Sequence, residues 1–140
     1  MAAPAKLLLS DLPKGHEFSP TSFTLSAEDV VRYLDAVADG NALYLERGLA
    51  PPLCVAARAL GALLELLELP AGTLHTGQEV DMQAGVPIGA TLTLGGRIAQ
   101  RSERGGAVIS AIDFDVTLEG ASAPALRGRT TVLVAVGGAS

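Results

Sequence analysis

The two histidines of the chain, His16 and His75, are the first residues to weigh for chemistry, because imidazole readily accepts a proton near pH 7. His75 lies in a run of alternating polar and apolar residues. It could serve there as a substitute general base, or as a hydrogen-bonded strand residue near an interface. His16 has no motif around it. The two histidines are far apart in sequence and lack a paired carboxylate pattern, so we expect no metal site.

Cys54 is the single cysteine, and it follows Pro51-Pro52, a suitable start for a helix. A thiol in the first turn of a helix can become a nucleophile, but a small buried residue is the commoner role. The backbone N–H groups of Leu53 and Cys54 are stronger candidates, because free amides at a helix start can hold a carbonyl oxygen of a ligand as negative charge develops on it. A lone cysteine excludes an internal disulfide framework and fits a reducing, cytoplasmic compartment.

Five arginines make up half of the Lys and Arg in this acidic chain: Arg97, Arg101, Arg104, Arg127 and Arg129. One hypothesis is a local patch for the phosphate groups of a ligand. The other is a set of solvent-facing strand residues paired with Asp113 and Asp115. Glu65 and Glu68 are open to two interpretations, catalytic carboxylates or the solvated stripe of a helix, and we favour the second.

The composition limits the functions that these residues can have. With 140 residues, 49% hydrophobic and 18% charged, the chain predicts one folded domain with a real core. A net charge of −5 and 4% aromatic residues argue against a nucleic-acid or anionic-membrane surface. The longest apolar stretch, residues 53–69, carries charges and is expected to be a buried helix, not a membrane span. The apolar run near the N-terminus is too short for a secretory signal.

Hydrophobic periodicity predicts the elements that position these residues. We expect an edge strand over 16–25, then a helix opened by Ser26 and Asp29 as a capping box and ended by Gly40. A polar connection over 39–50 leads to the buried helix. Alternating strands follow near 74–82, 92–94, 108–118 and 126–134. We interpret Gly95-Gly96 as a bulge and Gly105-Gly106 as a hairpin turn.

The resulting architecture is α+β, with a long central helix wrapped by an antiparallel β-sheet. We expect a loosely held lead-in over residues 1–15, a single domain over 16–136 and a short tail over 137–140. A long unpaired edge strand is a liability. We therefore expect a dimer whose sheets join edge to edge, homomeric when the chain is expressed alone.

The last two predicted strands have their apolar residues mostly at even positions. If they form a hairpin, directly opposed residues point to the same face, so Asp113 and Asp115 share a face with Arg127 and Arg129. One register sets Asp115 opposite Arg127 and Asp113 opposite Arg129, and the other sets Asp115 opposite Arg129. Arginines paired in this way are less free to hold phosphate.

The order of strand, helix, buried helix and four strands resembles a hot-dog fold. The segment Asp39-Gly40-Asn41-Ala42-Leu43-Tyr44 is similar to the Asp-x-Asn-Pro-x-His motif of MaoC-like (R)-specific enoyl-CoA hydratases and dehydratases. Three further segments resemble the N-terminal, FAS1-like dehydratase branch of that family: Ala50-Pro51-Pro52, Leu74 to Gln78, and Gly128 to Val134. The resemblance covers residues 15–136.

In that family the motif aspartate and histidine activate water, which adds across the double bond of a trans-2-enoyl thioester or leaves in the reverse direction. The resemblance places the motif on Asp39 and Asn41, with Tyr44 where the histidine stands. A phenol titrates near ~10 and is a poor base, and members of this branch often support a catalytic unit. The resemblance implies that the helix-start amides at Pro52, Leu53 and Cys54 line a thioester site, with His75 and Gln78 of the similar strand segment as further candidates. Arg97 and Arg129 of the arginine cluster are the candidates for its phosphate groups. The resemblance implies no cofactor beyond the coenzyme A thioester itself.

Three functional hypotheses follow from the resemblance. The first is a subunit that binds an acyl or enoyl thioester of coenzyme A or a carrier protein, in fatty acid metabolism, completed by a His-bearing hot-dog partner. The second is a self-sufficient homodimeric hydratase that uses Asp39. The third is a hot-dog acyl-CoA thioesterase. None of them calls for nucleic acid or a membrane as a partner.

Overall fold

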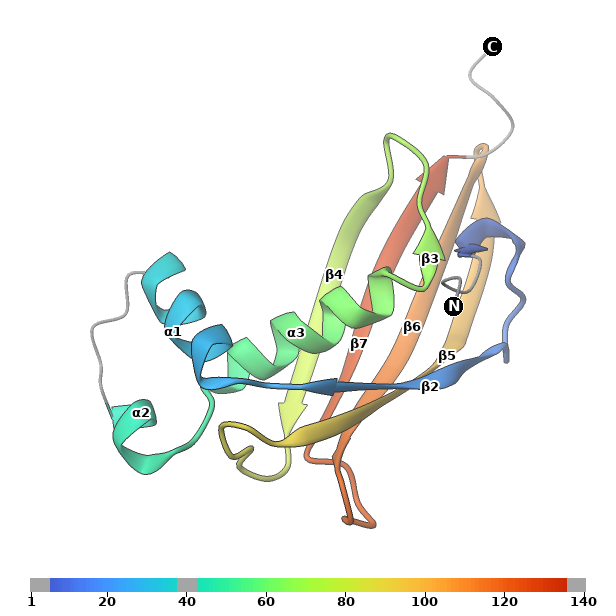
Figure 1. Cartoon of the computed structure of the whole chain (residues 1–140). Coiled ribbons are helices and arrows are strands. Elements are labelled where there is room, and N and C mark those ends of the chain that lie inside the picture. The colour runs from blue at the N-terminus through green and yellow to red at the C-terminus, as the bar shows by residue number, and fades with distance from the viewer. Residues whose placement is uncertain (1–5, 38–42, 136–140) are drawn as a thin grey trace.

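A five-stranded antiparallel sheet forms the body of the protein, and a helix lies across one face of it (Figure 1). The computed structural model describes residues 6–37 and 43–135. The strand order is β2-β5-β6-β7-β4. The strands are β2 (Glu17–Thr24), β4 (Leu74–Met82), β5 (Thr91–Arg104), β6 (Ala107–Leu118) and β7 (Leu126–Ala135). The α+β layout and the edge position of the first long strand are confirmed.

The helix before the central one, α1 (Ala27–Ala36), begins as its sequence predicts. The Ser26 hydroxyl accepts from the Asp29 N–H at 3.1 Å, and the Asp29 carboxylate accepts from the Ser26 N–H at 3.0 Å. These two bonds form a capping box, which satisfies two backbone donors that a helix start leaves free. Leu25 and Val30, on either side of the cap, are both fully buried.

The central helix, α3 (Pro52–Leu64), is shorter than predicted. The chain beyond it forms the short strand β3 (Leu67–Glu68), which pairs in parallel with β1 (Leu7–Leu8). Glu68 therefore leaves the helix, and the predicted stripe of Glu65 and Glu68 on α3 is wrong. The helix ends because its next residues gain a backbone partner some sixty residues away in sequence, which local periodicity cannot reveal.

The same pairing corrects the expectation of a loosely held lead-in for residues 7–12, the part of it that packs against the rest of the described chain. Leu9, in the 3-10 turn η1 (Leu9–Asp11), is fully buried, and Leu12 is 7% exposed. The Arg101 guanidinium donates to the Ser10 carbonyl at 2.9 Å. The N-terminal segment thus packs into the core and covers one end of the sheet.

Alternate residues of the strands point toward α3 and make the core. Gly96 lies within this packing, where an added Cβ would come within 3.3 Å of the Asp113 carbonyl oxygen and 3.6 Å of Leu63. Gly95 and Gly96 pair regularly with β6, and the irregularity of the β5–β6 ladder falls between Ile98 and Gln100. Toward β2, a register shift between Phe18 and Thr21 lies against Gly95, so the bulge predicted there is present but its extra residue is on β2. The tight hairpin at Gly105-Gly106, both with positive φ, is confirmed.

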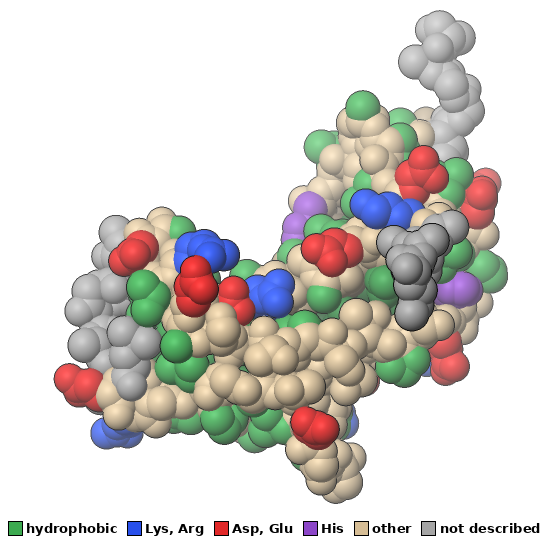
Figure 2. Space-filling view, in the orientation of Figure 1, with side chains coloured by type: hydrophobic (Ala, Val, Ile, Leu, Met, Phe, Trp, Pro, Cys, Tyr) green, Lys and Arg blue, Asp and Glu red, His purple; other side chains and the backbone are tan. Residues whose placement is uncertain are grey.

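One stripe of α3 is not covered. Leu53 is 64% exposed, and Ala57 and Gly61, which follow it at helical spacing, are exposed as well. We expected other parts of the protein to surround a helix that is apolar on nearly all sides. Within a single copy of the chain, however, only the side of α3 that faces the sheet is covered. Figure 2 shows the surface hollowed over α3, between α1 and the connection from β3 to β4.

The two free edges of the sheet are β2 and β4. Pro20 falls at a register shift within β2, where a missing N–H is tolerated. β4 has exposed side chains at most of its positions and has a neighbour, β7, on one side only. In the described part of the chain, no helix is long and apolar enough to span a membrane.

Candidate functional site

Tyr44 is the only one of the three candidate motif residues that the structure describes. Asp39 and Asn41 fall outside the described residues. Tyr44 lies in α2 (Leu43–Arg47), where it is half-buried and packs against the hydrophobic core. A phenol held in this position can donate or accept a hydrogen bond, but it is a poor base near neutral pH.

The start of α3 carries the next three candidates, Pro52, Leu53 and Cys54. The Cys54 N–H is already used, because it donates to the Pro51 carbonyl at 3.0 Å. This corrects the expectation that both helix-start amides are free, and leaves the Leu53 N–H as the candidate. Cys54 is 1% exposed, and burial raises the pKa of its thiol. The structure therefore favours the buried-residue interpretation of Cys54 over a nucleophile.

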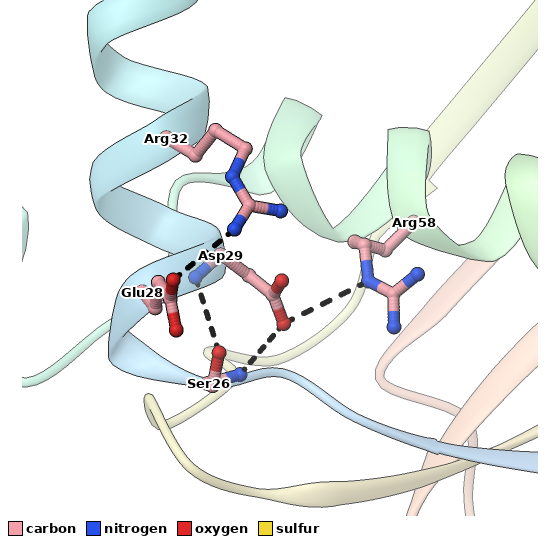
Figure 3. A network of polar contacts seen from close by, with 5 residues as sticks. All are labelled: Ser26, Glu28, Asp29, Arg32 and Arg58. Carbon is pink, nitrogen blue, oxygen red and sulfur yellow. Dashed lines mark hydrogen bonds and ion pairs between the residues drawn. The ribbon is translucent and has the colours of Figure 1, made fainter.

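A polar network ties α1 to α3 beside this helix start (Figure 3). The Asp29 carboxylate of the capping box lies 3.9 Å from the Arg58 Nε on α3. The Arg58 guanidinium also stacks over the Phe23 ring, 5.4 Å from its centroid. The backbone hydrogen bond from Ser26 is the main reason that the pKa of Asp29 lies below its usual value. Acidic and basic side chains alternate over α1 and the adjoining part of α3 (Figure 2).

His75 lies in a separate, apolar pocket between the second half of α3 and the strands β4 and β7. The pocket has a volume of about 290 Å³ and is lined by Leu60, Leu64, Leu69, Thr73, His75, Thr130 and Val132. The His75 Nε2 and the Thr130 hydroxyl are 2.5 Å apart, and either one can donate. Thr130 is fully buried, so this bond satisfies a hydroxyl that has lost contact with water. Gln78 pairs with Thr130 in the same ladder.

This pocket suits the aliphatic part of a ligand. Four of its seven lining residues are Leu or Val, and its volume is at the lower end of the range for ligand pockets. Of the residues that line this pocket, His75 was predicted from the sequence as a site residue, whereas Thr130 and the leucines were not. Thr130 stands among apolar residues on the core-facing side of its strand. Because a buried hydroxyl needs a hydrogen-bond partner, this threonine was the available sign of a polar contact there.

Arg97 and Arg129 lie on the opposite face of the sheet. The first of the two predicted registers is confirmed: Asp113 is paired with Arg129, and Asp115 with Arg127. Asp113 also lies 3.9 Å from Arg97, so both candidate arginines are held by a carboxylate. They line a hollow of about 780 Å³ that is larger than the His75 pocket. We give it less weight as a thioester site, because it is a charged surface remote from α3.

A single copy of the chain therefore does not bring the candidate site residues into one site. Leu60 and Leu64 follow Leu53 on α3 by seven and eleven residues, which separates the pocket from the helix start by about 10 to 16 Å. The two arginines are on the far side of the sheet. Among the described residues, no group of three or more His, Cys, Asp or Glu side chains could hold a metal ion.

Solved structures share this architecture. The (R)-hydratase from A. caviae involved in PHA biosynthesis is 20% identical with a TM-score of 0.72, and 87% of this chain covers 96% of that one. The MaoC-like dehydratase from Rhodospirillum rubrum is 18% identical with a TM-score of 0.72, over 95% and 99% of the two chains. The C-terminally truncated HadBC (3R-hydroxyacyl-ACP dehydratase) complex from Mycobacterium tuberculosis is 18% identical with a TM-score of 0.67, over 86% and 96%.

A long helix across a curved antiparallel sheet, shared with these structures, defines a hot-dog protein. A search of curated protein sequences finds no match. The sequence model of the FAS1-like, dehydratase domain region matches residues 13–119, well over half of the chain. The chain belongs to that family, among the MaoC-like hot-dog dehydratases and hydratases.

Proposed function

We propose that this protein is the thioester-binding subunit of a hot-dog hydratase or dehydratase, and that a His-bearing subunit completes the catalytic site. The observation that carries the proposal is the apolar pocket that opens beside the free edge strand β4. Tyr44, where the family motif has histidine, removes the expected base from this chain. The acyl part of an enoyl or 3-hydroxyacyl thioester would lie between Leu60, Leu64 and Val132.

The uncovered surfaces support such an assembly. β4 is a free edge, and the exposed stripe of α3 lies on the same side of the molecule as the pocket. If β4 pairs antiparallel with the matching strand of a second hot-dog subunit, a two-fold axis runs perpendicular to the joined sheet. The two central helices then run antiparallel on one face. The start of the partner's helix, with its motif loop, would lie next to the second half of α3 and its pocket.

The HadBC complex, similar in fold, is a precedent for two hot-dog chains in one dehydratase. A second candidate is the homodimeric hydratase that uses Asp39. It is favoured by His75, since each copy would bring a histidine toward the other's helix start. A thioesterase has less support, because Glu65 ends α3 and Glu68 lies in β3, and neither lines the pocket. The buried, reduced Cys54 suits the cytoplasm.

Calorimetric titration of the pure chain with acyl-CoA thioesters tests the proposal. Octanoyl-CoA should bind at least about tenfold more tightly than acetyl-CoA, because burying each added CH₂ contributes roughly 0.8 kcal/mol. Leu64→Trp, which fills the pocket, should abolish that preference and leave the affinity for free CoA unchanged. Val31→Trp, on the exposed side of α1, is the matched control. Equal affinity for the two thioesters would contradict an acyl-binding pocket.

A further inference from the structure

A row of alternating charges crosses the whole sheet on the face away from α3. Each member is directly opposite the next in the strand ladders: Glu79 on β4, Arg129 on β7, Asp113 on β6, Arg97 on β5 and Glu17 on β2. Opposed side chains on one face lie close enough to interact. The row therefore alternates in sign over all five strands and ends on a carboxylate at both edges.

A second, shorter row runs beside it. Asp81 on β4 is opposite Arg127 on β7, which is opposite Asp115 on β6. The edge strand thus presents two carboxylates, Glu79 and Asp81, on the same face, and none of its residues is Lys or Arg. A strand added to this edge would continue both rows. To continue the alternation of charge, the added strand needs one basic side chain opposite Glu79 and another opposite Asp81.

We propose that the partner at the β4 edge is a different hot-dog subunit, whose own edge strand carries Lys or Arg opposite Glu79 and Asp81. This inference rests on the edge-to-edge assembly of the proposed function, and it names the chemistry of the partner. Opposite charges across a strand pair stabilise it, and like charges destabilise it. The two acids would select the basic-edged subunit over a second copy of this chain.

A second copy fits this edge poorly in the three registers centred on Gln78, Glu79 or Val80. A two-fold axis at Gln78 makes the two Glu79 side chains diagonal neighbours. An axis at Glu79 sets them directly opposite each other, and an axis at Val80 sets Glu79 opposite Asp81. Because β4 has no basic residue, each register brings carboxylates together across the join.

A charge-swapped copy of the same chain can stand in for the basic-edged partner. Wild-type protein is mixed with Glu79→Lys/Asp81→Lys, marked by a mass tag, and dimers are counted by native mass spectrometry and sedimentation velocity. At low salt we expect mixed dimers to outnumber dimers of two like copies. The ratio of mixed to like dimers should be about tenfold above the ratio for random pairing. Roughly 0.5 M NaCl should return the ratio to random, because the Debye length falls below about 5 Å.

Glu17→Lys makes the same change in charge at the β2 edge, and mixtures of it with wild type should pair at random. Glu79→Gln/Asp81→Asn removes the repulsion without adding a cation, and its dimer should be tighter than that of wild type. Circular dichroism checks that all variants fold. Random pairing of the β4-swapped copy, or no mixed dimer at all, would overturn the inference. If pairing follows charge but octanoyl-CoA does not bind, the inference stands and the proposed function fails.

Discussion

Arg129 holds Asp113 with two hydrogen bonds across the neighbouring strands β7 and β6. The Nε donates to Oδ1 at 2.6 Å, and Nη2 donates to Oδ2 at 3.1 Å. The guanidinium thus grips both carboxylate oxygens in a fixed geometry. The bond pins the register of β6 and β7, and it holds an arginine that would otherwise be free for a phosphate group.

The first prediction concerns the pH dependence of this pair. The hydrogen bonds from Arg129 are the main reason that the pKa of Asp113 lies below its usual value. A lowered folded-state pKa contributes stability that is present above the unfolded pKa, near ~4, and is lost as the pH falls through the folded value. Asp113→Asn should lower the midpoint of urea unfolding slightly at pH 7. The difference from wild type should shrink as the pH falls below about 4, and a constant difference would contradict the pairing.

The alternation of side chains between the two faces of a strand, visible as even and odd residue numbers, accounts for what the sequence could predict about the sheet. Core residues of β6 and β7 fall mostly at even positions and the charged ones at odd positions, so the shared face of the acids and arginines followed from sequence, and the structure decides between the two registers left open. The same rule places Arg97 and Arg129 away from the central helix. His75 is odd but faces the pocket, because a bulge between His75 and Gly77 reverses the alternation. Gly77, an isolated glycine within the strand, was the local signal for that bulge.

The second prediction concerns the packing of α3. Leu63 is fully buried against the sheet, whereas Leu60 is half-buried and lines the pocket. Leu63→Ala should lower the free energy of unfolding by ~2–5 kcal/mol in chemical denaturation. Leu60→Ala should lower it clearly less, because part of that side chain already faces open space. Equal losses at the two sites would show that the pocket is closed.

The third prediction concerns Gly128, where β7 passes beneath an aromatic ring. A Cβ added at Gly128 would overlap the Phe114 ring and lie 2.9 Å from the Glu79 carbonyl oxygen. Gly128→Ala should therefore destabilise the protein by about 1–3 kcal/mol, the usual cost of overpacking. Gly77→Ala in β4 meets nothing closer than 3.9 Å and serves as the control. A neutral Gly128→Ala in thermal unfolding would contradict this close approach.

The fourth prediction concerns the thiol of Cys54. Because the side chain is 1% exposed and burial raises its pKa, a thiol reagent should react with it at least about a hundredfold more slowly than with the same chain in urea. Reaction rates over time, measured in native buffer and in denaturant, check this. Fast labelling of the folded protein would restore the nucleophile hypothesis.

The candidate site was less predictable than the sheet, for a physical reason. The sequence motif gave the neighbourhood of Tyr44 and the start of α3, since these are consecutive in the chain. The pocket combines Leu64, Thr73 and Thr130, which come from three distant segments. Such a constellation depends on where α3 crosses the strands, and residue spacing alone does not report that crossing.

Hydration of crotonyl-CoA by the pure chain is the most direct test of the central claim that this subunit binds a thioester but lacks its own base. The loss of enoyl-thioester absorbance should stay close to the uncatalysed rate. Tyr44→His should raise it, and a His-bearing hot-dog partner should raise it far more, since a positioned general base contributes about 10²–10⁴-fold. Rapid hydration by the unmodified chain, abolished by Asp39→Asn, would contradict the account.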